Sequence, residues 1–203
     1  MAVPFEQNNK ERLPYLHYLE EMKKLDPEEA AGRTGVPYSA ETKEFTFTLL
    51  NEKYTVSFPD FEVKDGELSI AEKILLMRYL LEGKLVPGSG KFMTYREMPW
   101  GEVYNQQFTG RCIMRLTFTY GTRPDVFSAI LEKLGGRPIK GADRAYDLDF
   151  MEGLQLRILL WEADDEFPPS VQILFSDNFQ FAFAAEDMAV VGDITINRMK
   201  KKQ

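Results

Sequence analysis

Cysteine and histidine are almost absent from this chain of 203 residues, which holds one of each, Cys112 and His17. A single cysteine cannot close an internal disulfide, complete a Cys₄ or Cys₂His₂ zinc site, or supply four thiolates to an iron–sulfur cluster. A single histidine cannot build a His₃ or two-His metal centre. The sequence therefore predicts no cofactor and no metal centre built from these residues.

Basic residues are fewer than acidic ones, 25 Lys and Arg against 32 Asp and Glu, so the net charge is −7. This balance argues against a nucleic-acid partner, because such binding needs clustered cations that displace phosphate counterions.

Long apolar runs are missing as well. The most apolar stretches, residues 156–161 and 179–191, are shorter or more interrupted than the roughly 20 residues that span a bilayer. The first residues also lack the basic and apolar regions of a signal peptide. We therefore expect no membrane association and a cytoplasmic location, with which the lone Cys112 agrees.

The length and the order of the expected elements predict one α+β domain over residues 1–203, with residues 1–9 as a loose arm. Strands cluster instead of alternating with helices, which favours a mostly antiparallel sheet packed with several helices. Helices are expected over residues 13–24, 27–32, 69–83, 102–120, 123–135 and 186–200. Strands are expected over residues 44–50, 54–58, 145–150, 154–162 and 171–175, with residues 179–183 as core-facing sheet.

Local signals support several of these elements. Asp26 before Pro27 is typical of a helix start, and Gly32 is the expected end of that helix. Ser69 begins a capping box, and Thr94 begins another on a short turn. Apolar residues recur every three residues in the first helix and every four in the helix over 102–120, which predicts a buried face on each. These faces consist of Leu13, Leu16, Leu19, Met22 and Leu25, and of Tyr104, Phe108, Cys112 and Leu116.

A glycine-rich loop is the first candidate binding segment, with Gly88, Gly90 and Lys91 followed by Tyr95 and Arg96. It differs from a phosphate-binding P-loop in three respects. A helix precedes it where a strand is required, the first template glycine falls on a leucine, and Phe92 replaces the hydroxyl residue. A surface turn is the simpler interpretation, although free backbone N–H groups with Lys91 and Arg96 could hold an anion.

An acidic stretch beside a tryptophan is the second candidate segment. Its residues are Trp161, Glu162, Asp164, Asp165 and Glu166, between an expected strand and a Pro-Pro pair. Clustered carboxylates suit Mg²⁺ or Ca²⁺, but the spacing does not match an EF-hand loop. Exposed acids on a loop at the end of a strand are the commoner case, and loops of this kind also carry binding residues.

The chain resembles a prokaryotic family known as domain of unknown function 3786. The matching segments follow the same order along nearly the whole sequence. They are residues 75–81, 90–92, 95–99, 104, 108, 134–136, 160–168, 173–175 and 186–187. The resemblance implies no enzyme class and no catalytic residues. It implies an origin in anaerobic bacteria or archaea, where some members carry a cysteine-rich iron–sulfur domain. This chain lacks those cysteines, so the implied partner would be a separate iron–sulfur protein.

Two functional hypotheses follow. The first is a binding or accessory module with a protein partner, whose surface joins the loop from Gly88 to Arg96 to the segment from Trp161 to Phe167. The alternative is an enzyme that uses the acids Glu162, Asp164, Asp165 and Glu166 as a general base or as Mg²⁺ ligands.

Overall fold

The computed structural model describes residue 5 and residues 8–203, and it confirms the α+β class. Most of the expected N-terminal arm, residues 1–4 and 6–7, lies outside the described residues. The chain forms two compact units. The first comprises the described residues up to Thr48 together with Lys53–Leu85, and the second comprises Leu49–Glu52 and Val86–Gln203.

The first unit contains a small antiparallel sheet and three helices among the described residues. The strands are β1 (Tyr38–Ser39), β2 (Glu44–Leu49) and β3 (Glu52–Ser57), in the order β1-β2-β3. The helices are α1 (Asn9–Met22), α2 (Pro27–Thr34) and α3 (Ile70–Glu82). The predicted hairpin is confirmed, but its turn is one residue shorter than the three residues, 51–53, that the expected strands leave between them. Leu50 and Asn51 connect its strands with positive φ angles of 47° and 66°, as a two-residue hairpin turn requires.

The starts of helices α2 and α3 follow the sequence signals. Asp26 caps α2 by accepting hydrogen bonds from the backbone N–H groups of Glu28 and Glu29. Ser69 forms the predicted capping box with Glu72 at the start of α3. The expected end of α2 at Gly32 is wrong, because α2 continues to Thr34 and ends at Gly35, which has the left-handed φ of 72°.

The predicted buried face of α1 is only partly correct. Met22 is fully buried, whereas Leu13 and Leu16 are 55% and 40% exposed. A step of three residues in an α-helix falls about 60° short of a full turn. Three such steps therefore place Leu13 on the side of the helix opposite Met22, and a repeat of three cannot form one continuous face.

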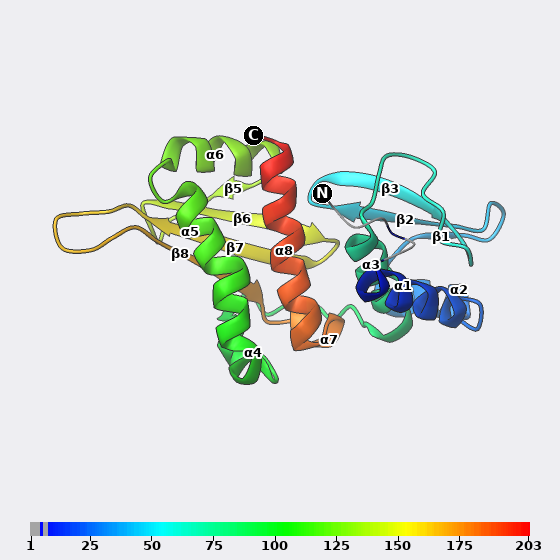
Figure 1. The fold of residues 1–203 in the computed structure, drawn as a ribbon. Coiled ribbons are helices and arrows are strands. Elements are labelled where there is room, and N and C mark those ends of the chain that lie inside the picture. Colours follow the sequence, from blue (N-terminus) through cyan, green and yellow to red (C-terminus); the bar gives the residue numbers. More distant parts are fainter. Residues whose placement is uncertain (1–4, 6–7) are drawn as a thin grey trace. The chain divides into compact units, whose positions relative to one another are not determined.

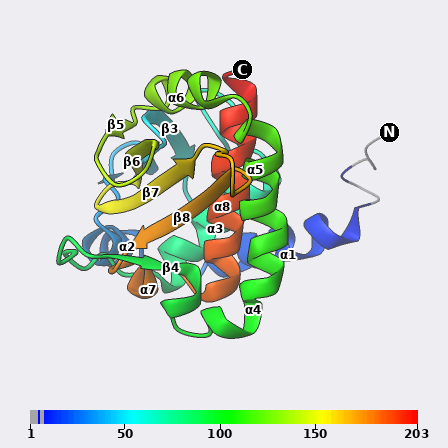
Figure 2. The same cartoon turned by 90° about the vertical axis from the view of Figure 1, so that its left-hand side faces the viewer.

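The second unit contains an antiparallel sheet of five strands among the described residues, in the order β4-β8-β7-β6-β5. The strands are β4 (Phe92–Thr94), β5 (Arg137–Pro138), β6 (Arg144–Met151), β7 (Leu154–Trp161) and β8 (Ser170–Ser176). The α-helices are α4 (Gly101–Phe108), α5 (Met114–Tyr120), α6 (Pro124–Lys133), α7 (Phe179–Ala182) and α8 (Ala185–Lys201). Helices α5 and α8 lie against the same face of the sheet (Figures 1 and 2).

Sequence reasoning found the three long strands and missed the short ones. Alternation predicts β6, β7 and β8, whereas β4 and β5 have only three and two residues and too little pattern to detect. The expected sheet at residues 179–183 is wrong, because Phe179–Ala182 forms helix α7 and Phe181 is 49% exposed. Phe179 and Phe183 are buried, at a separation of four residues that also suits one side of a helical turn.

Residues 101–120 form one helical stretch with a π turn, Thr109–Ile113, between α4 and α5. Phe108, Cys112, Leu116 and Tyr120 are all buried, although a step of four residues in an α-helix turns about 40° beyond a full turn. The wider π turn compensates for part of this rotation, so the residues that follow it keep facing the core. The expected burial of Tyr104 is wrong, because this residue precedes the π turn and is 42% exposed.

Helix α8 approaches the π turn very closely at Gly192. A methyl group at this glycine would lie 2.6 Å from the sulfur of Cys112 and 3.3 Å from the Phe108 ring. On the same side, the Asp193 carboxylate accepts hydrogen bonds from Arg111 and from Arg115, the latter at 2.8 Å. In the sequence, Gly192 weakens the pattern expected of a helix. The structure explains the glycine, because a larger residue would leave no room for Cys112 of the π turn.

We expect Gly192→Ala to destabilise the protein by about 1–3 kcal/mol through overpacking. In a Cys112→Ala background the same change should cost clearly less, since the sulfur is gone and alanine is the better helix former, while the Phe108 ring still lies 3.3 Å from the added methyl group. Urea unfolding of the wild type, the two single variants and the double variant measures the coupling between the two sites.

Gly32→Ala in α2 is the control, because nothing lies within 4 Å of the added methyl group. It should stabilise the protein in either background. An equal cost of Gly192→Ala with and without the Cys112 sulfur would contradict the close contact.

Candidate functional site

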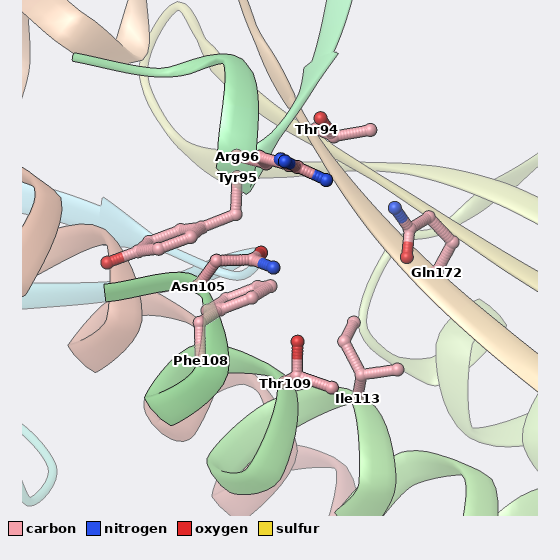
Figure 3. A pocket seen from close by; sticks show the side chains of 8 residues that line it. All are labelled: Thr94, Tyr95, Arg96, Asn105, Phe108, Thr109, Ile113 and Gln172. Carbon is pink, nitrogen blue, oxygen red and sulfur yellow. The ribbon is translucent and has the colours of Figure 1, made fainter. Parts of the chain in front are cut away.

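A cavity of about 250 Å³ lies where β4 ends beside β8. Strand β4 pairs with β8 only from Ser176 to Leu174, so β4 does not extend along the earlier part of β8, which includes Gln172. The 3₁₀ turn Tyr95–Glu97, helix α4 and the π turn surround this position (Figure 3). The lining residues are Thr94, Tyr95, Arg96, Asn105, Phe108, Thr109, Ile113 and Gln172.

One wall of the cavity is apolar and rigid. The rings of Tyr95 and Phe108 are stacked with centroids 4.1 Å apart and planes 4° apart, and both residues are buried. The Tyr95 hydroxyl donates a 2.8 Å hydrogen bond to the backbone oxygen of Ala185. Burial raises the pKa of Tyr95 to about 12. This phenol is therefore a structural group, and it stays protonated at physiological pH.

Polar side chains form the rest of the lining. Asn105, Thr109 and Gln172 are half-buried and point toward the cavity (Figure 3). Their side chains have no hydrogen-bond partner among the described residues of the chain. Water can reach half-buried amides and hydroxyls such as these, and a bound ligand can replace that water. Their unused donors and acceptors are therefore available to a molecule in the cavity.

Arg96 is held at the rim of this cavity by Glu102. The guanidinium donates from Nε and Nη2 to the Glu102 carboxylate, with a distance of 2.9 Å from Nη2 to Oε1. This ion pair raises the pKa of Arg96. The neighbouring Glu97 accepts from the backbone and the hydroxyl of Thr94, both at 2.7 Å, and these bonds lower its pKa.

The glycine-rich loop lies elsewhere along β8. Ser89 donates from its backbone N–H, at 3.0 Å, and from its hydroxyl to the Asp177 carboxylate, and this lowers the pKa of Asp177. Asp177 also donates its backbone N–H to the oxygen of Lys91 at 3.0 Å. Gly88 and Gly90 are exposed, and Gly90 adopts the positive φ of 87°. In this loop, the Asp177 carboxylate therefore accepts from the Ser89 N–H and hydroxyl, the donors that an external anion would otherwise bind.

The acidic segment lies at the opposite end of β8, where Trp161 pairs with Ser170. It forms the loop between β7 and β8, which extends beyond the sheet (Figure 1). The seven residues of β8 span about 20 Å at the usual rise per residue. The structure therefore separates this segment from Gly88, Gly90 and Lys91, and only Tyr95 and Arg96 of the candidate residues line the cavity at β4.

Two of the four acids of this segment, Glu162 and Asp164, have structural partners. The Asp164 carboxylate accepts from the backbone N–H groups of Glu166 and Phe167 at 2.8 and 2.7 Å, which lowers its pKa. Glu162 forms an ion pair with Arg144 at 3.2 Å. Glu162 and Asp164 themselves, together with Trp161 and Phe167, line a second cavity of about 450 Å³. The structure therefore brings three of the candidate residues, Trp161, Glu162 and Asp164, together at this end of β8. Asp165 and Glu166 are exposed.

No group of three or more His, Cys, Asp or Glu side chains among the described residues could hold a metal ion. Within the same part of the chain, no helix has the length and apolar character needed to cross a bilayer. Cys112 is buried as expected, and burial raises the pKa of its thiol to about 12.

Comparison with protein families confirms the resemblance that the sequence indicates. A family model described as a domain of unknown function, DUF3786, matches residues 26–198. The chain belongs to this family. No curated protein and no solved structure showed a significant match. The function is therefore not given by any relative, and nothing in these comparisons favours the enzyme alternative.

The cavity residues Asn105, Thr109 and Gln172 were missed by sequence reasoning. They are isolated polar residues on two helical segments and a strand, with no motif that joins them. The nearest signal was Gly110, which weakens the helix over 102–120 and lies within the π turn. Interruptions of this kind are frequent at functional sites.

The Asp164 turn gives a testable prediction. Its folded-state pKa is depressed, so the turn is fully held above the ordinary Asp pKa of about 3.9 and is lost as the pH falls through the lower folded value. We expect the NMR signals of the Glu166 and Phe167 amides to titrate together with the Asp164 carboxyl. Asp164→Ala should increase hydrogen exchange at both amides. Asp165→Ala is the matched control and should leave both unchanged, and equal effects of the two variants would exclude this role.

Proposed function

We propose that this protein is a non-catalytic binding module and that the cavity between β4, β8 and the π turn is its site for a small polar molecule. The observation that supports this is the convergence of Asn105, Thr109 and Gln172, whose side chains have no partner among the described residues. Pockets with an apolar wall and a few convergent polar groups are the usual form of small-molecule sites.

The lining favours binding over catalysis. It contains no carboxylate, imidazole, thiol or amine that could act as a general base or a nucleophile. Its one phenol, Tyr95, is committed to the backbone of Ala185 and has a pKa of about 12. The cavity can hold and orient a ligand, but none of these side chains is poised to transfer a proton near neutral pH.

A second candidate function is that of an accessory protein for a protein partner, as the first sequence hypothesis expects, but on a surface other than the one that this hypothesis names. Large apolar side chains are exposed along the helical stretch 101–120 and just before it, with Trp100 at 76% and Phe118 at 78%. Val103 and Met114 are also exposed there. Neighbouring exposed apolar side chains are typical of interaction surfaces, and Met114 and Phe118, four residues apart, are neighbours on the helix surface. The resemblance implies an iron–sulfur protein as the partner.

We also propose that the chain acts as one domain in the cytoplasm of an anaerobic prokaryote. The family model spans residues of both compact units, which supports a single functional domain. The cytoplasmic location is supported by the single, buried and unpaired Cys112, which suits a reducing compartment.

The binding function predicts a direct spectroscopic response. Titration with a panel of small amides, alcohols and carboxylates should shift the side-chain NH₂ signals of Asn105 and Gln172 in ¹H–¹⁵N NMR spectra. For the molecules that bind, Asn105→Leu should weaken affinity by roughly fivefold, since one hydrogen bond contributes about 1 kcal/mol. Gln106→Leu, on the same helix but outside the lining, is the matched control. A panel that moves neither NH₂ signal would overturn the proposed function.

The accessory function predicts that Phe118→Ser reduces recovery of a partner from a native lysate. The control, Val126→Ser, changes an exposed apolar residue on α6. A recovered partner with iron–sulfur absorbance would agree with the family-based expectation. Equal recovery by wild type and Phe118→Ser would exclude this surface.

A further inference from the structure

We propose that the ligand of the cavity is a small organic carboxylate with a compact apolar part. This inference rests on the proposed binding function and narrows it to one chemical class. It depends on three features of the lining, which are the free edge of Arg96, the charge balance and the apolar wall.

The guanidinium of Arg96 has an edge that Glu102 does not use. Glu102 accepts from Nε and Nη2, which form one edge of the planar group. Arginine has five N–H donors in a fixed fork, so its Nη1 side can bind a second carboxylate while the first remains in place. Arg96 lines the cavity, and its guanidinium nitrogens lie on the side of Thr94 and Gln172 (Figure 3).

The charges around the cavity favour an anion of low charge. No Asp or Glu lines the cavity, and the nearby carboxylates of Glu97 and Glu102 are already paired with Thr94 and Arg96. The amide nitrogens of Asn105 and Gln172 and the hydroxyl of Thr109 add neutral donors. One partly neutralised arginine with neutral donors suits a single carboxylate better than a group with two or more charges.

The size and the wall of the cavity define the rest of the ligand. A volume of about 250 Å³ lies just below the roughly 300–1,000 Å³ of sites for drug-sized molecules, so the ligand must be small. Phe108, stacked on Tyr95, and Ile113 provide apolar surface within this space. Burial of an apolar group against them adds affinity that a bare anion such as acetate cannot obtain.

Benzoate and its neutral analogue benzamide test this assignment, with the side-chain NH₂ signals of Asn105 and Gln172 as the readout. We expect benzoate to shift both signals and to bind more tightly than benzamide and acetate. Arg96→Gln should weaken benzoate binding by roughly fivefold, because the side chain of Arg96 is 65% exposed and solvent weakens an ion pair with it. Benzamide binding should change little in the same variant.

Two further variants separate the charge of Arg96 from that of its partner. Glu102→Gln leaves Arg96 unpaired and should strengthen benzoate binding. The double variant Arg96→Gln with Glu102→Gln restores the charge balance but should still bind benzoate weakly. Arg137→Gln, which changes an exposed arginine paired with Asp149, is the matched control and should bind as wild type does.

The outcomes distinguish this inference from the function on which it rests. Benzamide binding as tight as benzoate binding, or benzoate binding that is insensitive to Arg96→Gln, would overturn the carboxylate assignment and leave the binding module intact. No response of either NH₂ signal to benzoate, benzamide or the wider panel would overturn both proposals.

Discussion

The close contact between Gly192 of α8 and Cys112 of the π turn is the constraint on which the second unit depends. It brings two helical segments together at a distance that excludes even one methyl group. Asp193 strengthens the same contact by accepting from both Arg111 and Arg115. The π turn keeps Phe108, Cys112, Leu116 and Tyr120 buried along one stretch of helix. With that stretch held in place, Asn105 and Thr109 on its preceding turns reach the edge of β8.

The cavity then follows from the shortness of β4. A longer β4 would pair its backbone with β8 beyond Leu174 and take the space beside Gln172. Instead the chain leaves the sheet at Thr94 and enters a 3₁₀ turn that places Tyr95 on the ring of Phe108. The sheet edge is covered by side chains and not by a strand. An amide and a hydroxyl of the helix therefore face the amide of Gln172 across a small space that no backbone group fills (Figure 3).

Patterns within one element were enough to predict most of the fold. The capping box at Ser69, the Asp26 cap and the alternation in β6 to β8 depend on neighbours within a few residues, and each is confirmed. Features that depend on a second element were missed or misread. Gly192 looks like a weakness in a helix until α8 is placed against Cys112. Gln172, likewise, is one polar residue in a strand until β4 is known to stop at Thr94.

The same distinction explains why the candidate segments of the sequence differ from the cavity. Conspicuous acids and glycines mark places where the chain must turn, and there the side chains bind the backbone nearby. Asp164 holds the loop between β7 and β8, and Asp177 holds the glycine-rich loop through Ser89. These hydrogen bonds give both carboxylates a structural role within their own loops, although Asp164 accepts both of its bonds at Oδ1 alone. The cavity differs in this respect, because the side chains of Asn105, Thr109 and Gln172 do not hold any turn of the chain. A site for an external molecule is therefore expected where polar groups converge without local partners, and sequence patterns, which report local partners, are poorly suited to reveal it.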